Sequence, residues 1–440
     1  MKSRSLEAGW IGSRLRTARG AALALGVLVF LAAFLAAAFP RAMDTYQDTA
    51  LRDAVERSSP EQRSLVATVD HRLPGRPGES PAWAPLAPQD QEQAVRDILA
   101  GVHAPARITA ADVSYGVRSS AELTATDPWL PRPGSQDPRF QLDARADLGE
   151  HTEPVAGALP RGEAEKNLGE VLFQAAVTEA TARALRIRVG SELHFTRITP
   201  DKRPPTVTVR ITGIVRPLRA KSDFWTMDPL LAAPRLTDMP VAPGSPGLPP
   251  RIWRGALLLP PESGPSLFAE LGAEFLPEGN TEPQVYWQLP FDTRSLAGRD
   301  AELLRKELVR VLDGPGLEDL RAKVSENLEV KSGLPPVLET YTRLRAAVVP
   351  VVAVAAFGVG TTGAVVVLMS GGLSLVRREA ELRLLRSRGG SLKGIAGRLA
   401  LETAAAALPA AAAGLALAVA LLPDGRLLPA LLAVAALAAL

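Results

Sequence analysis

Residues 346–376 have the sequence AAVVPVVAVAAFGVGTTGAVVVLMSGGLSLV, without a single charged side chain. A second uncharged run, GAALALGVLVFLAAFLAAAF, occupies residues 20–39 near the amino terminus. A hydrocarbon core about 30 Å thick is crossed by roughly 20 helical residues that rise 1.5 Å each. Both runs reach this length, so the sequence predicts membrane helices at residues 20–40 and 346–376.

The charges beside these runs predict their orientation. Residues 1–19 are rich in arginine and hold one acidic residue, Glu7, and residues 377–398 are again dominated by arginine. Because cytoplasmic loops carry an excess of Lys and Arg, both segments are predicted to be cytoplasmic and residues 41–345 extracytoplasmic. A cleaved secretory signal is the rival interpretation of the first run, but its apolar region would be only about 7–15 residues long. We therefore expect a multi-pass protein of the cell membrane.

The chain continues with two more apolar segments. Residues 399–422 predict a third membrane helix, residues 423–426 (Pro-Asp-Gly-Arg) an outer turn, and residues 427–440 the start of a fourth helix. Fourteen residues rise only about 21 Å, less than the hydrocarbon core. We therefore expect the sequence to be the amino-terminal part of a longer protein.

The insert at residues 41–345 predicts a large α+β domain. Within Val171–Val215, the pattern predicts a helix from Thr178 to Leu185, followed by strands over residues 192–198 and 206–215 that pair antiparallel. An amphipathic helix is expected at Ala301–Leu312. Residues 73–90 and 240–250 are rich in Pro and Gly and are expected to be loops. The fold class is thus membrane α-helical, with about four transmembrane helices, the last incomplete, and this domain between the first two.

Helix-compatible residues border the insert on both sides and predict a stalk. Residues 41–59 extend the first membrane helix, and residues 336–349 lead into the second. The spacing predicts one apolar stripe on each stalk helix. These stripes comprise Met43, Tyr46 and Ala50 on the first helix and Leu338, Tyr341 and Leu344 on the second.

Several kinds of chemistry lack their sequence signals. The chain has no cysteine, which excludes disulfides, thiolate metal sites and cysteine nucleophiles. It contains no phosphate-binding G-x-x-x-x-G-K-S/T loop, no G-x-S-x-G elbow and no H-E-x-x-H pair. His71, His103, His151 and His194 are far apart in sequence and are expected to be solvated or packed. Basic and acidic residues nearly balance, at 50 and 47, so nucleic-acid binding is unsupported. The chain is predicted to be neither an enzyme nor a binder of a metal or cofactor.

The basic segment after the second apolar run has the features of a docking helix. On a helix, Leu382 and Leu385 lie on one side and would fill an apolar groove of a partner, while the surrounding arginines pair with acidic residues there. The simpler alternative is that these arginines fix the topology and bind anionic lipid head groups, at about 1 kcal/mol each. Both roles are compatible.

The same segment resembles a known family. Its pattern R-R-E-x-E-L-x-L-L-R-x-R-G-G, followed by a glutamate in the next apolar segment, is similar to the membrane domain of FtsX-like and MacB-type ABC transporter permeases. The resemblance implies that this loop docks on a cytoplasmic ABC ATPase, which binds the ATP. The residues implied in coupling are Arg377, Arg378, Glu379, Glu381, Leu382, Leu385, Arg386, Arg388, Gly389 and Gly390. Glu402 is expected near the start of the third membrane helix, either as an interface anchor that favours the positive helix end or in packing and coupling.

The insert carries a second match to the same family. Val177-Thr178-Glu179-Ala180, the following helix and hairpin, and Val209-x-Ile211-Thr212-Gly213-Ile214-Val215 resemble its periplasmic core domain. The later Phe224-Trp225-x-x-Asp228 is similar to long actinobacterial members. Residues 60–160 and 220–330 match only loosely, and the incomplete fourth helix departs from the pattern.

The resemblance implies a permease subunit that couples ATP hydrolysis in a partner to movement of the outer domain. It also implies a second permease half or a homodimer, because two ATPases need two docking loops. Two alternatives remain. The chain could be a mechanical regulator of cell-wall hydrolases, or a membrane-anchored binding or sensory module without an ATPase. No residue in the sequence identifies a substrate.

Overall fold

The computed structural model describes residues 19–70, 85–119, 122–133, 136–167, 170–196, 206–239, 249–270, 283–377, 379–387, 391–423 and 425–438. These residues form two compact units. The helical unit comprises the described residues of Met1–Asp53, Ala297–Ala301 and Thr340–Leu440, and the sheet unit those of Ala54–Leu296 and Glu302–Glu339. Most of the two predicted Pro- and Gly-rich loops, residues 73–90 and 240–250, lies outside the described residues, and residues 88–90 begin a helix instead of belonging to a loop.

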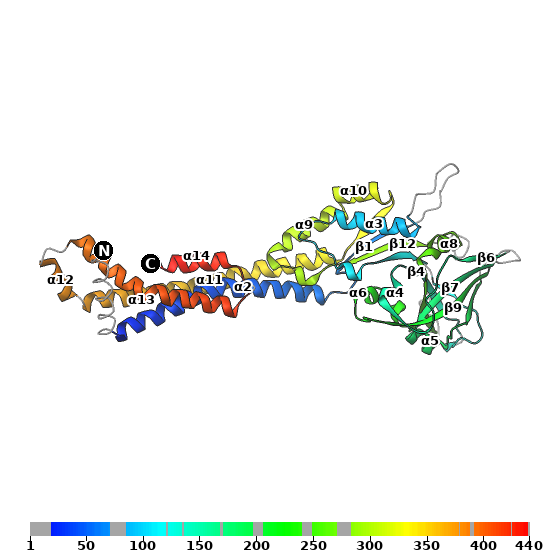
Figure 1. Cartoon of the computed structure of the whole chain (residues 1–440), viewed down its shortest axis with the longest axis horizontal. Coiled ribbons are helices and arrows are strands. Elements are labelled where there is room, and N and C mark those ends of the chain that lie inside the picture. Colours follow the sequence, from blue (N-terminus) through cyan, green and yellow to red (C-terminus); the bar gives the residue numbers. More distant parts are fainter. Residues whose placement is uncertain are drawn as a thin grey trace, which may run out of the picture. The chain divides into compact units, whose positions relative to one another are not determined.

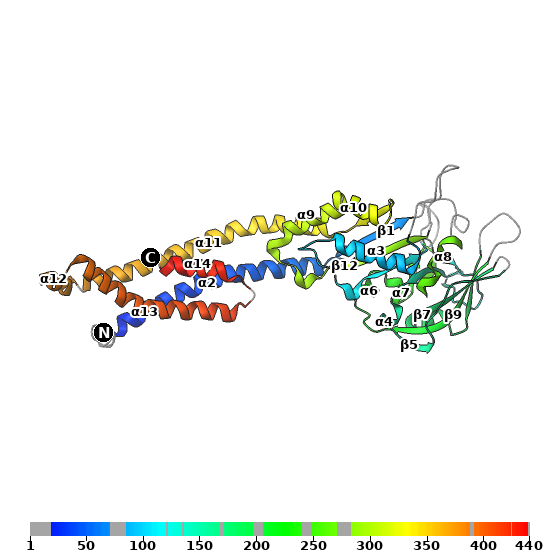
Figure 2. The ribbon, with the colours of Figure 1, turned by 45° about the horizontal axis from the view of Figure 1, so that its top comes forward.

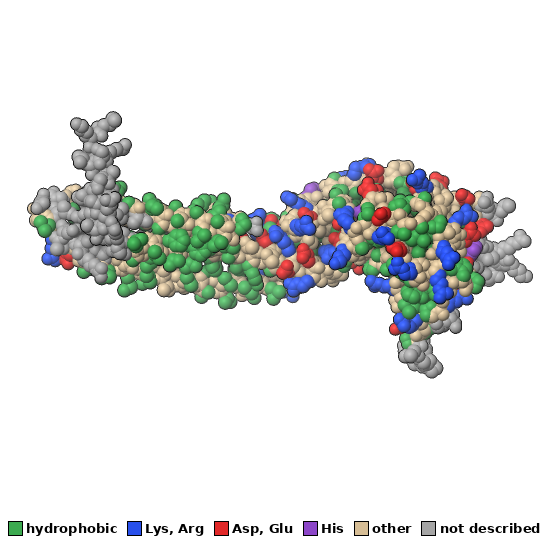
Figure 3. All heavy atoms as spheres, turned by 60° about the horizontal axis from the view of Figure 1, so that its bottom comes forward, with side chains coloured by type: hydrophobic (Ala, Val, Ile, Leu, Met, Phe, Trp, Pro, Cys, Tyr) green, Lys and Arg blue, Asp and Glu red, His purple; other side chains and the backbone are tan. Residues whose placement is uncertain are grey.

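Long apolar helices make up the helical unit (Figure 1). They are α2 (Arg19–Glu56), α11 (Leu334–Arg377), α13 (Leu392–Leu421) and the shorter α12 (Glu379–Ser387) and α14 (Leu427–Ala438). Among the described residues, three stretches are long and apolar enough to cross a membrane: Leu23–Glu56, Leu334–Leu373 and Leu392–Leu421. Hydrophobic side chains gather on the outside of these helices (Figure 3), and Val354 and Phe357 are 74% and 75% exposed. A soluble protein rarely exposes such an extensive apolar surface.

Small residues allow the helices of this unit to pack closely. Ala37 of α2, Ala418 of α13 and Ala430 of α14 form a buried cluster. A Cβ atom added to Gly414 would lie 2.6 Å from the Phe30 carbonyl oxygen, so α13 approaches α2 closely at this glycine. Small residues at helix interfaces permit this type of backbone approach, as in membrane helix packing.

One connected mixed sheet organises the sheet unit (Figure 2). Its main order is β13-β1-β12-β2-β4-β11-β7-β9-β5, and β3, β6, β8 and β10 pair off this path. The strands are β1 (Ser64–Asp70), β2 (Ser114–Arg118), β3 (Leu123–Thr124), β4 (Arg139–Arg145), β5 (Thr152–Gly157), β6 (Glu165–Asn167), β7 (Glu170–Thr178), β8 (Glu192–Thr196), β9 (Thr206–Pro217), β10 (Arg235–Asp238), β11 (Arg251–Leu259), β12 (Gln284–Pro290) and β13 (Leu328–Lys331). The pairs β4–β11 and β7–β9 are parallel, whereas the other pairs are antiparallel.

Short helices accompany this sheet. The α-helices are α3 (Pro88–Gly101), α4 (Leu148–His151), α5 (Glu179–Leu185), α6 (Asp223–Thr226), α7 (Pro229–Ala232), α8 (Gly264–Glu270), α9 (Ala301–Leu312) and α10 (Pro315–Lys323). The predictions for Val171–Val215 are confirmed: Thr178 caps α5 through its side chain, and β8 pairs antiparallel with β9. The predicted helix at Ala301–Leu312 is also confirmed, although Leu303 is 57% exposed while Leu304 and Leu308 are buried.

The two faces of the β12–β2–β4 region are covered differently. Trp287 of β12 is buried, and its indole N–H donates to the Gln91 carbonyl of α3, so α3 lies over the apolar face. On the other face, Arg145 of β4 donates to the Phe224 carbonyl of α6. Side chains alternate between the two faces of a strand, so the second face holds the polar residues of β4. Both faces are therefore covered around Trp287 and Arg145.

The stalk stripes predicted from the sequence are partly wrong. Most of the predicted stalk residues are helical, within α2 and α11, whereas residues 57–59 follow the end of α2. Tyr46 and Leu344 are 63% and 64% exposed. Leu51, on a different side of α2 from Tyr46, is fully buried instead. The packed side of α2 also carries polar residues such as Asp48, so the spacing of apolar residues alone does not identify that side.

Candidate functional site

The predicted coupling residues fall around α12. Arg377 ends α11, and α12 contains Glu379, Glu381, Leu382, Leu385 and Arg386. Arg378, Arg388, Gly389 and Gly390 lie outside the described residues. The helix places Leu382 and Leu385 three positions apart, as the docking hypothesis requires. Their role remains a prediction.

The described side chains of α12 are directed to solvent. Arg383 and Glu379 form an i,i+4 ion pair at 2.5 Å, and both side chains are exposed. Leu384 is 56% exposed and Arg386 is also exposed. An exposed pair of this kind stabilises a helix by only about 0.3–0.5 kcal/mol. This short helix is thus marginal by itself, since isolated helices below roughly 12 residues are rarely stable.

Glu402 lies in the body of a helix, which corrects the reasoning from the sequence. Because α13 begins at Leu392, this carboxylate is not near a helix start. The field of the helix dipole falls off within the first turn, so it cannot favour Glu402 there. Ser391 is the residue at the helix start, and its side chain accepts the Gly394 N–H at 3.1 Å.

A buried arginine of α2 caps the end of α13. Arg41 is 1% exposed, and its Nε donates to the Leu422 carbonyl oxygen at 2.8 Å while Nη2 donates to that of Pro423 at 3.0 Å. Arg426 forms a bidentate ion pair with Asp44, in which both N···O distances are 2.8 Å. Helix carbonyls at a carboxyl terminus need outside donors, and Arg41 supplies them. These contacts tie α2 to the connection between α13 and α14.

A short segment is held between α2 and α11. The Gly298 N–H donates to Asp48 Oδ1 of α2 at 2.7 Å, and the Gly298 carbonyl accepts from Arg345 Nη1 of α11 at 2.9 Å. Tyr341 of α11 donates its hydroxyl proton to the Gln47 carbonyl of α2 at 3.0 Å. In sequence, this Ala297–Ala301 segment leads from β12 to α9. It is therefore hydrogen-bonded to both long helices while covalently continuous with the sheet unit.

The sequence of β4 places a row of polar side chains on one face of the sheet. Arg139-Phe140-Gln141-Leu142-Asp143-Ala144-Arg145 alternates polar and apolar residues. Strand pairing sets Arg118 of β2 opposite Asp143 and, on its other side, opposite Gln284 of β12. Alternation of this kind is typical of a half-exposed strand. The structure instead covers much of the row with the segment that carries α6 and α7.

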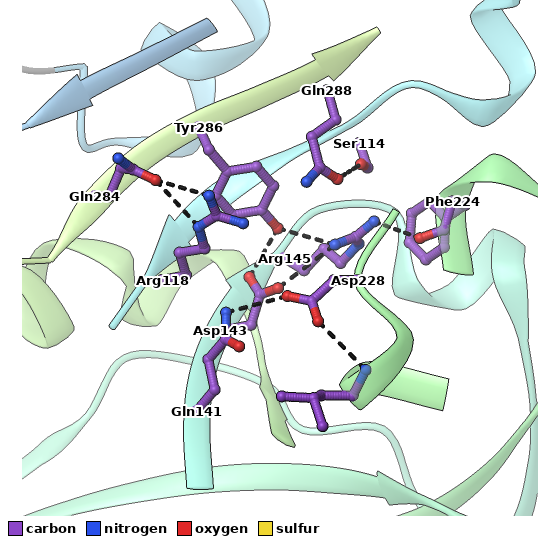
Figure 4. Close-up of polar contacts among 11 residues, drawn as sticks. Ser114, Arg118, Gln141, Asp143, Arg145, Phe224, Asp228, Gln284, Tyr286 and Gln288 are labelled. Atoms are coloured by element: carbon purple, nitrogen blue, oxygen red, sulfur yellow. Dashed lines mark hydrogen bonds and ion pairs between the residues drawn. The ribbon is translucent and has the colours of Figure 1, made fainter. Parts of the chain in front are cut away.

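A charged network lies at the centre of this row (Figure 4). Tyr286 donates its hydroxyl proton to Asp143 Oδ1 at 2.8 Å and accepts one from Arg145 Nη1 at 3.2 Å. Arg145 Nη2 donates to the Phe224 carbonyl at 2.6 Å, and its guanidinium lies 4.1 Å from the centre of the Phe224 ring. Asp143 and Arg145 are each 1% exposed. Their mutual attraction is needed to offset the cost of removing both charges from water.

Burial governs protonation in this network. It raises the pKa of Asp143, an effect opposed by Arg145 and by the Tyr286 hydrogen bond. It raises the pKa of the Tyr286 hydroxyl well above its ordinary value, which keeps this group a proton donor at neutral pH. Burial also lowers the pKa of His151, whose ring stacks on Phe224 with centres 3.7 Å apart. Here His151 acts as a packed aromatic group.

The sequence motif Phe224-Trp225-x-x-Asp228 turns out to cover this network. Phe224 and Trp225 are buried in a cluster with Leu148 and Val215. Asp228 caps α7 and accepts a hydrogen bond from Gln141 at 3.2 Å. In the sequence the motif is distant from β4, and no local pattern links the two segments.

Within the described parts of the chain, no group of three His, Asp or Glu residues is close enough to hold a metal ion. Comparisons of the sequence with protein-family models and with curated proteins find no match.

Proposed function

We propose that this chain is a membrane-embedded, permease-type subunit that couples ATP hydrolysis in a separate cytoplasmic ATPase to movement of an outer α+β domain. The sequence resemblance to FtsX-like and MacB-type permeases supports this assignment. In this proposal, α2, α11 and α13 cross the cell membrane, α12 faces the cytoplasm, and the sheet unit is extracytoplasmic. The proposal needs a path for movement between the membrane helices and the outer domain.

Helix length supports such a path. The 38 residues of α2 and 44 of α11 correspond to about 57 and 66 Å at 1.5 Å per residue, well beyond a hydrocarbon core of about 30 Å. Each helix is continuous, because α2 passes Pro40 and α11 passes Pro350 without a break. A tilt or shift of either helix in the membrane would therefore be transmitted along its full length.

The observation that carries the proposal is the Ala297–Ala301 segment. Gly298 is bonded to Asp48 of α2 and to Arg345 of α11, so relative movement of the two helices must change at least one of these contacts. The segment is also the covalent link from β12 to α9. Movement of the helices would thus act directly on the chain of the sheet unit.

The proposed topology predicts opposite labelling of two engineered cysteines. The native chain has none, so Glu163→Cys in the sheet unit and Lys393→Cys after α12, both exposed positions, report without background. In intact cells, an impermeant maleimide should label the first and leave the second unlabelled until the cells are opened. Equal labelling of both positions in intact cells would contradict the topology.

Enlarging Gly298 is expected to uncouple the helices. A Cβ atom at this position would overlap the Tyr341 hydroxyl and lie 2.8 Å from the Gln47 carbonyl oxygen. Overpacking of this kind costs about 1–3 kcal/mol, enough to displace the segment or to separate α2 from α11. Spin labels at the exposed positions Tyr46 and Leu344 measure the distance between these helices, with and without ATP and the ATPase.

We expect an ATP-dependent change in that distance in the otherwise unmodified chain and its loss in Gly298→Ala. Gly360→Ala is the matched control, because a Cβ atom there meets nothing within 4 Å on α11. A distance that does not respond to ATP in the unmodified chain would refute the coupling proposal. A response that survives in Gly298→Ala would instead remove the segment from the path.

A second candidate function is a membrane-anchored binding module without an ATPase. A polar cavity in the sheet unit, lined by residues that include Arg118 and Asp228, favours it. The spin-label measurement separates the two functions, since a binding module has no reason to respond to ATP. The alternative of a cell-wall hydrolase regulator shares the coupling mechanism and differs in the outer partner.

A further inference from the structure

A cavity of about 290 Å³ opens at one end of the polar row on the β12–β2–β4 sheet. Its lining includes Arg118, Glu122, Gln141, Asp228, Arg254 and Gln284. All belong to the sheet unit and come from five separate places in the chain. The two arginines and two carboxylates give the lining no net charge, so its charge does not favour anions or cations as a class.

The charged residues of the cavity differ in how they are paired. Arg254 and Glu122 form a close ion pair, with N···O distances of 2.5 and 2.6 Å. Arg118 instead donates to a neutral amide oxygen of Gln284, at 2.7 and 3.2 Å, and stacks 4.9 Å from the centre of the Tyr286 ring. Within the described residues, no carboxylate lies within 4 Å of its guanidinium nitrogens. Arg118 is thus a positioned cation without an ion-pair partner there.

Asp228 is the complementary case. Its Oδ2 accepts from the Gln141 amide at 3.2 Å, and its Oδ1 accepts from the Leu230 backbone N–H at 3.3 Å. Both partners are neutral, and no Lys or Arg of the described chain lies within 4 Å of this carboxylate, although Arg254 of the same cavity attracts it at longer range. Figure 4 shows Asp228 and Arg118 on either side of the Asp143 side chain. The cavity therefore presents one cation and one anion, each held by neutral hydrogen bonds.

These two side chains are fixed before any ligand arrives. Arg118 lies between its cross-strand neighbours Gln284 and Asp143, and Asp228 is the capping residue of α7. Preorganised polar groups lower the entropy cost of binding. A ligand that supplies a carboxylate to Arg118 and an ammonium to Asp228 would form two charge-assisted hydrogen-bonded pairs.

We propose that this cavity binds a small zwitterion, with the anionic group of the ligand, a carboxylate or a phosphodiester, on Arg118 and its ammonium on Asp228. Its volume equals that of about ten water molecules of roughly 30 Å³ each, which fits a free amino acid or a short peptide. The soluble head group of a zwitterionic lipid has the same pair of charges. The proposal concerns the sheet unit alone and does not depend on coupling to an ATPase.

The experiment is a binding measurement by calorimetry on the full chain in detergent micelles. The probes are alanine, dialanine and glycerophosphoethanolamine, each at up to millimolar concentration, together with N-acetyl-alanine and alanine amide, which lack one charge. We expect at least one zwitterion to bind and both singly charged analogues to bind about tenfold more weakly or worse, because each loses one charge-assisted pair. Which of these probes binds shows whether the natural ligand is an amino acid or peptide, or a lipid head group.

Two variants test the assigned residues. Arg118→Gln and Asp228→Asn each remove one charge, and Asn retains the capping oxygen of α7. Each should weaken binding about tenfold or more, whereas Arg183→Gln, at a site 75% exposed on α5, should leave it unchanged. Melting curves establish that each variant is folded. Absence of binding for all three zwitterions, or binding unchanged in both folded variants, would overturn the proposal.

Discussion

Replacement of Arg145 by methionine is expected to lower the free energy of unfolding of the sheet unit by about 3–5 kcal/mol, because it leaves a buried carboxylate without its cation. Asp143 is 1% exposed and would keep the Tyr286 hydrogen bond and the weaker attraction of Arg118, its cross-strand neighbour. In a domain of this size the loss corresponds to a fall in melting temperature of roughly 10 °C. The fluorescence of the buried Trp225 and Trp287 reports unfolding of this unit.

Two controls distinguish lost pairing from general damage. Arg183→Met alters an exposed arginine and should shift the melting temperature little. Adding Asp143→Asn to Arg145→Met removes the unpaired charge and should recover much of the loss. If Arg145→Met had the same melting temperature as the native chain, the network would contribute nothing to stability.

Acidic conditions should reduce the defect of the Arg145→Met variant. Burial raises the pKa of Asp143 in the native chain, and Arg145 opposes this shift, so its removal raises the pKa further. A carboxyl group whose folded-state pKa is raised favours folding when protonated, and that contribution is lost as the pH rises through the folded pKa. The gap in stability between variant and native chain should therefore narrow as the pH falls.

If the chain binds a cytoplasmic ATPase as proposed, the double substitution Leu382→Asp with Leu385→Asp is expected to abolish that association. If these leucines fill an apolar groove, each aspartate buries a carboxylate without a partner, at a cost of several kcal/mol. A micromolar complex would be weakened about 100-fold or more. The measurement is the amount of Walker-motif ATPase that co-purifies with the tagged chain from its native membrane.

The matched control keeps the charge and moves it to the opposite side of α12. Leu384→Asp with Ser387→Asp shifts both substitutions by two residues, or about 200° around the helix. Both positions are exposed, and we expect co-purification to persist. If the two double variants lose the ATPase equally, charge repulsion explains the loss and the groove hypothesis fails.

Local sequence signals predicted the elements of this chain well where one physical cause dominates. Uncharged runs such as residues 346–376 predicted long apolar helices, since a helix pairs the backbone polar groups of such a run internally. The helix at Ala301–Leu312 and the β8–β9 pair follow from periodicity within one short stretch. The membrane crossing and its orientation remain proposals built on those helices.

The charged network of Asp143, Arg145 and Tyr286 could not be predicted, because its burial depends on segments that are distant in the sequence. The alternation in β4 indicates that Asp143 and Arg145 share a face. It does not indicate that this face is covered by α6, which lies some 80 residues further along the chain. Glu402 illustrates a different limit. An apolar run marks where hydrophobicity begins, whereas α13 begins earlier, at Leu392, within a polar stretch that is also helical.

The strand order of the sheet has a consequence for synthesis of the protein. The early strand β1 lies between β12 and β13, near the end of the insert. At about 5–20 residues per second, a ribosome needs roughly 10–40 s to extend the nascent chain from β1 to β12. Throughout that interval β1, with the sequence SLVATVD, has no native partner and is a ready template for wrong pairing. Emergence of the last two strands therefore sets the earliest time at which this sheet is complete, and a chaperone that shields β1 until then should raise the yield.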